Sequence, residues 1–174
     1  MARLPRIVVP GCPHHVTARG NRREPIFFED GDQDIYCDVL AEQMRKAQVE
    51  VWAYCLMPNH VHLILCPDDA TGLARALGAA HKRWANFING RGRWRGHLFD
   101  GRFASVAMDD AHLIACLRYV ALNPVRARLA AIAHLAERRA VTLSAPAWPL
   151  ACVAYGIIFH TVPSLYFPPP SVVP

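Results

Sequence analysis

The sequence has few of the features that mark secreted proteins, membrane-spanning proteins or proteins with a structural zinc site. Its six cysteines include no CxxC pair, so neither a zinc knuckle nor a redox motif is indicated. The apolar stretch near Met1 is too short for a signal peptide. The longest apolar run, Leu150 to Phe159, is too short to span a bilayer as a helix. We therefore expect a cytoplasmic protein with no membrane partner.

Lysine is also scarce, because 17 of the 19 basic residues are arginine. Arginine can hold a phosphate with two parallel hydrogen bonds. Residues 75–139 contain 12 basic and 4 acidic residues, a balance of +8, whereas the rest of the chain contains 7 basic and 10 acidic residues, a balance of −3. This concentration of arginine favours an anionic partner, although a solvated basic surface would have the same composition.

Charge is missing altogether from one part of the chain. Residues 140–174 contain no Asp, Glu, Lys or Arg, yet they contain seven of the 14 prolines. The total length of 174 residues suits one domain with a proper core. We therefore divide the chain into one domain, residues 1–131, and an atypical uncharged Pro-rich tail, residues 132–174, to which the sequence assigns no function.

The pattern along the domain predicts strands that alternate with helices. Strands are expected at residues 14–19, 49–57, 60–66 and 103–108, where β-branched and aromatic residues gather. Helices are expected at residues 32–48, at 71–88 with Thr71 as the N-cap, and from 109 or 110 to at least 122. Pro58-Asn59 separates two strands and favours a hairpin. Together these elements predict a compact sandwich of helices and an antiparallel or mixed sheet.

His60 and His62 form the sharpest local feature. Side chains alternate across a strand, so both imidazoles share one face, where they can chelate a divalent ion. Leu63 and Leu65, which follow, indicate that this face turns inward, and buried histidines need partners. A polar strand face with two unrelated histidines would show the same spacing, and the pair alone does not separate these readings.

Tyr119 is a candidate nucleophile on the last expected helix. If that helix continues to Asn123, the two side chains are neighbours one turn apart, although Pro124 disfavours helical geometry at Asn123. A phenol is a weak nucleophile near neutral pH, because its ordinary pKa is about 10. Attack on a phosphate would therefore need a nearby metal or cation. A tyrosine that only packs in the core is the structural alternative.

Two arginine-rich segments have the composition of nucleic-acid contacts. The run Arg19-Gly20-Asn21-Arg22-Arg23 joins a glycine, which allows close backbone approach, to cations that can hold phosphates. The segment 91–103 interleaves arginines with aromatic residues, a mixture that suits unpaired bases stacked on rings. A mobile basic loop is the alternative. The candidate DNA contacts are Arg19, Asn21, Arg22, Arg23, Lys82, Arg83, Arg95, Arg102 and Arg126.

The chain resembles the REP-associated tyrosine transposases through four motifs that follow in order: HVTARGNRREPIF, YCLMPNHVHLIL, GHLFDGRF and RYVALNPVRARL. These transposases are single-tyrosine relatives of the HUH endonucleases and of the enzymes that move small single-stranded insertion sequences. The resemblance covers roughly residues 1–129. It implies an α+β sandwich in which helices flank a central antiparallel sheet, similar to ferredoxin-like and RNA-recognition folds.

The resemblance also implies a role for each site residue. His60 and His62 match the two metal ligands, with Asn123 as a third ligand and Mg²⁺ or Mn²⁺ as the metal. Tyr119 matches the nucleophile that forms a 5′-phosphotyrosine and leaves a free 3′-hydroxyl. The implied partners are single-stranded DNA hairpins of the REP kind, bound by a monomer or a homodimer.

The chain departs from the family pattern in two places. Asp100 stands where a glutamine is expected, and after about Ala131 the usual ending gives way to the uncharged tail. One hypothesis is that a frameshift replaced the original C-terminus. Two other function classes stay open: a non-catalytic protein that binds single-stranded DNA or RNA hairpins, and a histidine–metal hydrolase that uses activated water.

Overall fold

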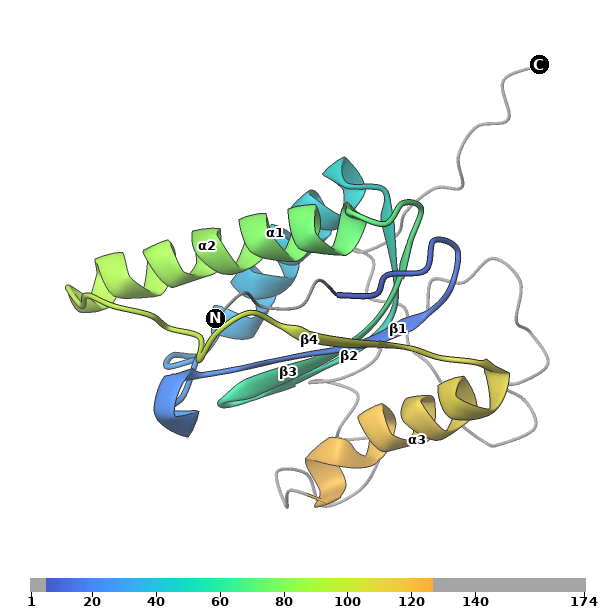
Figure 1. The fold of residues 1–174 in the computed structure, drawn as a ribbon. Coiled ribbons are helices and arrows are strands. Elements are labelled where there is room, and N and C mark those ends of the chain that lie inside the picture. Colours follow the sequence, from blue (N-terminus) through green and yellow to red (C-terminus); the bar gives the residue numbers. More distant parts are fainter. Residues whose placement is uncertain (1–5, 127–174) are drawn as a thin grey trace.

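The computed structural model describes residues 6–126, so the predicted tail and the boundary at residue 131 lie outside the described residues. Its elements in chain order are β1 (His14–Arg19), the 3₁₀-helix η1 (Asn21–Arg23), α1 (Asp32–Lys46), β2 (Val49–Met57), β3 (His60–Pro67), α2 (Gly72–Gly92), β4 (Ala104–Ala107) and α3 (Asp110–Arg126) (Figure 1). In this part of the chain, no helix combines the length and apolar character that crossing a membrane requires.

The four strands form one antiparallel sheet in the order β2-β3-β1-β4. The expected hairpin joins β2 to β3 across Pro58-Asn59, and β1 lies against the other edge of β3. In this register Arg19 is opposite His60, and His15 is opposite Ile64. The fold class expected from the sequence is therefore confirmed: helices flank a central antiparallel sheet.

The sheet separates two cores. Helices α1 and α2 cover one face, and α3 covers the other (Figure 1). The larger core includes Leu63 and Leu65 of β3 together with the fully buried Trp84 of α2. The smaller core includes Ile64 of the same strand and Val120 of α3. Strand alternation thus divides β3 between the layers, and burial of these side chains holds each helix layer on the sheet.

Helix α2 is longer than expected, because it continues past Ile88 to Gly92. The sequence after Ile88 is rich in glycine and arginine, a composition that predicts a loop. In the structure, Arg91 donates hydrogen bonds to both carboxylate oxygens of Asp32, at 2.7 and 2.8 Å. This contact between α2 and α1 supports the last turn, which ends at Arg93 in the left-handed conformation.

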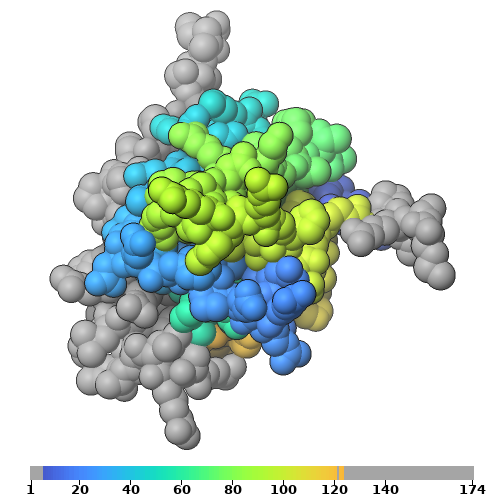
Figure 2. Space-filling model, turned by 90° about the vertical axis from the view of Figure 1, so that its left-hand side faces the viewer, coloured from blue at the N-terminus to red at the C-terminus, as the bar shows by residue number. Residues whose placement is uncertain are grey.

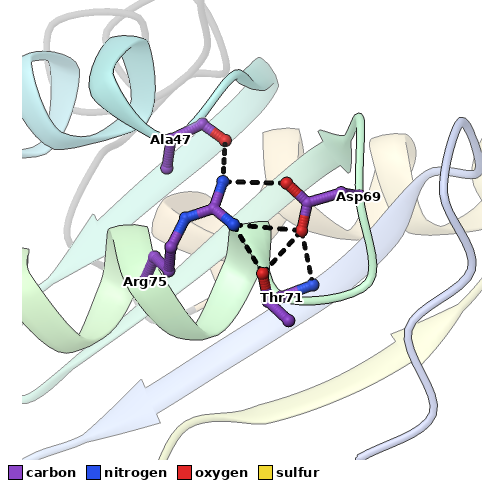
Figure 3. A network of polar contacts seen from close by, with 4 residues as sticks. All are labelled: Ala47, Asp69, Thr71 and Arg75. Carbon is purple, nitrogen blue, oxygen red and sulfur yellow. Dashed lines mark hydrogen bonds and ion pairs between the residues drawn. The ribbon is translucent and has the colours of Figure 1, made fainter.

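Thr71 is the N-cap residue of α2, as the sequence predicted, but its side chain does not bond to the helix backbone. Its hydroxyl donates instead to Asp69 at 2.7 Å. Arg75 contacts the same carboxylate, at 2.8 Å for its closest pair, and also donates to the carbonyl of Ala47 (Figure 3). Asp69 therefore competes successfully for the hydroxyl, and the resulting network joins the start of α2 to the end of α1.

Candidate active site

The two histidines of the HxH motif lie together on β3, on the face that α3 covers. The ring centroids of His60 and His62 are 5.0 Å apart. His62 is 6% exposed, whereas His60 is half-buried. The inference that Leu63 and Leu65 extend this same face is wrong, because they alternate with the histidines and pack toward α1 and α2.

Tyr119 of α3 approaches these histidines from the helix layer. Its ring stands edge-on to that of His62, with a centroid distance of 5.2 Å and an interplanar angle of 86°. Tyr119 is 39% exposed, so its ring is accessible to solvent while it contacts a buried histidine. The structure therefore brings together three residues predicted from motifs that lie 57 residues or more apart, counted from His62 to Tyr119.

Asn123 lies one helical turn beyond Tyr119 and is 8% exposed. The doubt raised by Pro124 does not apply, because α3 continues through it to Arg126. Tyr119 and Asn123 are thus i,i+4 neighbours on one helix, as the motif spacing predicted. The neutral amide of Asn123 provides a carbonyl oxygen, which is a suitable ligand for a hard divalent cation.

A third histidine, His15 of β1, completes the cluster and was not predicted. Its Nε2 lies 3.0 Å from Nδ1 of His62, and the two rings are stacked with centroids 5.2 Å apart. His15 also faces Tyr119, at 6.4 Å between ring centroids. The alternation of β1 could have placed His15 on one face of its strand, but the sequence does not reveal that β3 lies beside β1.

Burial controls the charge of the cluster. It lowers the pKa of His62 to about 4, and the neighbouring charges of His60, His15 and Arg19 contribute to this shift. Burial likewise lowers the pKa of His60 and of His15. The imidazoles are therefore neutral at physiological pH, which is the state that a metal ligand requires.

The ring nitrogens of His60 and His62 are engaged in the same way. Nδ1 of His60 lies 2.7 Å from Oδ1 of Asn59, and Nδ1 of His62 lies 3.0 Å from His15. Nε2 of His62 is buried and has no hydrogen-bond partner. A buried nitrogen without a partner is rare and needs an explanation, and a bound cation supplies one. The residues present thus fit a divalent metal.

The composition of such a site is constrained. Within residues 6–126, no group of three or more His, Cys, Asp and Glu side chains could hold a metal ion. A cation here would therefore take two imidazoles and complete its coordination with an amide oxygen, water or substrate. Imidazole nitrogen alone would suit several divalent ions, so these ligands do not select one metal.

Four of the predicted DNA contacts lie at the same end of the sheet. Arg19 ends β1 opposite His60, and η1 follows immediately with Arg22 and Arg23 exposed. The backbone of this segment is fixed: Asn59 donates to the carbonyl of Arg23 at 2.9 Å, and the backbone N–H of Asn21, the fourth contact, donates to the carbonyl of Leu98 at 2.8 Å.

The turn after β1 needs a glycine at position 20 because the backbone of Glu24 passes very close to it. A Cβ at this position would lie 2.2 Å from the carbonyl oxygen of Glu24, a distance that real Cβ atoms do not show. The backbone N–H of Gly20 also donates to the carbonyl of Asn59 at 2.8 Å, so this tight turn lies beside the β2–β3 turn. The glycine is thus required by packing, although its φ of −62° is ordinary.

The remaining predicted contacts are more scattered. Lys82 and Arg83 lie on α2, in the layer opposite α3, and Arg83 forms an ion pair with Glu42 of α1. Arg95 and Arg102 are exposed in the segment between α2 and β4. Arg126 is the last residue of α3, and its side chain lies outside the described residues.

An aromatic pocket at the end of α2 was only partly foreseen. Trp94 is 51% exposed and lies edge-on to Phe28, with ring centroids 5.0 Å apart. The pocket is also lined by Ile88 and Arg91. The chain around η1 and the end of α2 lie together on one side of the molecule, with α3 at its lower border (Figure 2). Exposed rings beside arginines are suited to stacking with unpaired bases.

The fold is that of a class of transposases. The family described as IS200-like transposases matches residues 8–123, and the chain therefore belongs to this family. This confirms the relationship to single-tyrosine transposases inferred from the four motifs.

A solved structure agrees at the level of the fold. The chain is 18% identical to the structure of a REP-associated tyrosine transposase bound to a REP hairpin, with a TM-score of 0.64, and the match covers 97% of this chain and 93% of the other. A second structure, described as that of a candidate transposase from Deinococcus radiodurans, is 20% identical over 68% of this chain and 95% of the other, with a TM-score of 0.48. A search among curated proteins finds no match.

Proposed function

We propose that this transposase cleaves and rejoins single-stranded DNA at hairpin repeats through a 5′-phosphotyrosine on Tyr119, in the cytoplasm and with Mg²⁺ or Mn²⁺. The observation that carries the proposal is the contact between Tyr119 and His62, whose Nε2 is buried without a partner. A nucleophile and a candidate cation ligand thus meet on the face between β3 and α3.

The chemistry begins with the phenol of Tyr119. Its oxygen attacks a backbone phosphorus, a bond forms between them, and the bond from phosphorus to the 3′-oxygen breaks. The phenol releases its proton in this step, and the departing strand end takes up a proton and becomes a 3′-hydroxyl. A second 3′-hydroxyl can attack the phosphotyrosine, restore the phosphodiester and release the phenol. No external energy source is needed, because the number of phosphoester bonds is unchanged.

His60, His62 and Asn123 are proposed to hold the cation. A divalent ion bound there would polarise a non-bridging phosphate oxygen and offset the charge that develops during attack. The protein contributes position: β3 fixes the two imidazoles, and α3 fixes Tyr119 at 5.2 Å, ring to ring, from His62. Such placement lowers the entropic cost of bringing nucleophile and phosphate together.

Hairpin DNA is proposed as the substrate because two independent features support it. The REP-associated transposase with the same fold was solved with a REP hairpin bound. In this chain, Arg19, Arg22 and Arg23 lie at the end of the sheet that carries His60, where they can hold the backbone that enters the site. The protein is proposed to act as a monomer or a homodimer.

A denaturing gel tests the proposal. Protein is incubated with end-labelled hairpins from the source genome and Mn²⁺, and we expect a band shifted by the mass of the protein. Tyr119→Phe and a chelator should both abolish it. Tyr54→Phe is the matched control, because Tyr54 is buried on the opposite face of the sheet.

The other outcomes assign the open alternatives. Cleavage without a shifted band would point to activated water rather than to the tyrosine. Binding of hairpins without any cleavage would point to the non-catalytic class.

A further inference from the structure

We infer that His15 is a positioning residue that fixes the ring orientation and the tautomer of His62, so that the lone pair of Nε2 is directed at the cation site. This inference rests on the proposed function, since it deepens the proposed cation site. It adds a residue from β1 to a site otherwise built from β3 and α3.

The hydrogen bond between the rings of His15 and His62 contains a single proton, which belongs to one of the two nitrogens. Nε2 of His15 and Nδ1 of His62 are 3.0 Å apart, so one nitrogen donates and the other accepts. If His15 donated, the proton of neutral His62 would be on Nε2. That N–H would be buried without an acceptor and would repel a cation.

The opposite assignment leaves no such conflict. If Nδ1–H of His62 donates to Nε2 of His15, then Nε2 of His62 carries a lone pair. The lone pair remains buried and unpartnered until a cation arrives, and cation binding then satisfies it. His15 in this arrangement carries its own proton on Nδ1.

His60 provides an independent parallel. The amide of Asn59 is oriented by its other end, because its Nδ2 donates to the carbonyl of Arg23 at 2.9 Å. Its Oδ1 therefore faces Nδ1 of His60, at 2.7 Å, and can only accept. The proton of neutral His60 is thus placed on Nδ1 and its lone pair on Nε2, the same arrangement inferred for His62.

His15 differs from the adjacent His14 in what its ring nitrogens contact. His14 is fully buried on the other side of β1, where its Nδ1 lies 2.8 Å from the carbonyl of Cys12 and its Nε2 accepts from the N–H of Val9. Its two ring nitrogens are thus occupied by backbone groups. His15, by contrast, contacts a side chain of the site.

Manganese binding and nitrogen NMR test the inference on DNA-free protein. In calorimetry, His15→Ala should bind Mn²⁺ about 10- to 100-fold more weakly than the wild type. His15→Gln should restore part of the affinity, because the end of a glutamine side chain can accept a hydrogen bond at the position of Nε2. His112→Ala is the control, since His112 is exposed near the start of α3.

The second measurement does not depend on metal. Long-range ¹H–¹⁵N spectra of the metal-free protein should show His62 protonated on Nδ1, and His15→Gln should keep this tautomer while His15→Ala loses it. A proton on Nε2 of wild-type His62, or unchanged Mn²⁺ affinity in His15→Ala, would overturn the inference. If the wild type bound no Mn²⁺, the proposed cation site would fail, and the tautomer would still decide the role of His15.

Discussion

The ring of Tyr119 stands edge-on to the ring of His62, and these two residues come from neighbouring layers of the molecule, α3 and the sheet. The contact is made by a helix that packs on β2 and β3 through Leu113 and Val120. The geometry of the site therefore depends on the smaller of the two cores. A helix held by this core positions the proposed nucleophile more rigidly than a loop would.

The exposed arginines of η1 should determine part of the salt dependence of DNA binding. The double substitution Arg22→Gln/Arg23→Gln is expected to weaken hairpin binding and to reduce the slope of log affinity against log salt by about 1 for each phosphate that is no longer neutralised. Fluorescence anisotropy across a salt series measures this slope. Arg75→Gln is the control, because Arg75 is engaged with Asp69 at the start of α2 (Figure 3). Equal slopes in all three proteins would remove η1 from the DNA interface.

Trp94 should contribute by stacking on an unpaired base. Trp94→Ala is expected to cost about 1–3 kcal/mol of affinity for hairpins with single-stranded flanks, whereas Trp94→Phe should retain much of it. Blunt hairpins without flanks should bind the wild type and Trp94→Ala alike. Titrations of both substrates measure the difference, and an equal weakening on blunt hairpins would show that Trp94 contacts duplex instead.

The contact between Asp32 and Arg91 should stabilise the protein in a pH-dependent way. Hydrogen bonds from Arg91, followed by those from the backbone of Phe28 and Glu29, lower the pKa of the buried Asp32 carboxyl to about 2. Because the folded pKa lies below the unfolded one, this stability is present above about pH 4 and is lost as the pH falls toward 2. Asp32→Asn should therefore cost about 2 kcal/mol at pH 7 in urea unfolding and much less at about pH 2.5. A destabilisation of the same size at both pH values would contradict the electrostatic explanation.

His81 should give the protein a second, separate pH dependence. Burial lowers the pKa of His81 to about 4, where its ring is stacked on Phe99 and hydrogen-bonded to the hydroxyl of Tyr36. The unfolded chain binds one more proton than the folded chain between about pH 6.5 and 4, so the free energy of unfolding falls as the pH is lowered through this window. In His81→Gln this decline should be smaller. Urea titrations at about pH 7, 5.5 and 4.5 measure it, and parallel declines in both proteins would assign the effect to other groups.

The elements and the candidate site residues His60, His62 and Tyr119 were predictable because their signals are local. Each of β1, β2 and β3 shows its own pattern, and the HxH spacing alone places His60 and His62 on one face. The approach of Tyr119 could be expected only through the resemblance between motifs, since nothing in the spacing states how α3 crosses the sheet. The identity of the site residues was therefore easier to predict than their distances from one another in the fold.

The features that were missed depend on side-chain contacts that the local sequence pattern does not reveal. His15 acquires its role from the register between β1 and β3, which sequence alternation does not reveal. Thr71 has the sequence position of a helix cap, but the carboxylate of Asp69 competes for its hydroxyl. The extra turn of α2 likewise depends on Asp32, 59 residues before Arg91. The partners of His15 and Arg91 lie far along the chain, whereas the partner of Thr71 is a neighbouring carboxylate.

Mapping the covalent adduct tests the central claim most directly. After incubation with a hairpin oligonucleotide and Mn²⁺, the protein is digested with nuclease and trypsin, and the peptides are sequenced by mass spectrometry. Cleavage after Arg118 and Arg126 releases the peptide of residues 119–126, which begins with Tyr119. We predict a nucleotide phosphate on Tyr119 of this peptide, dependent on Mn²⁺ and on intact His60 and His62. Cleaved DNA with this peptide unmodified, or an adduct on any other residue, would contradict the account.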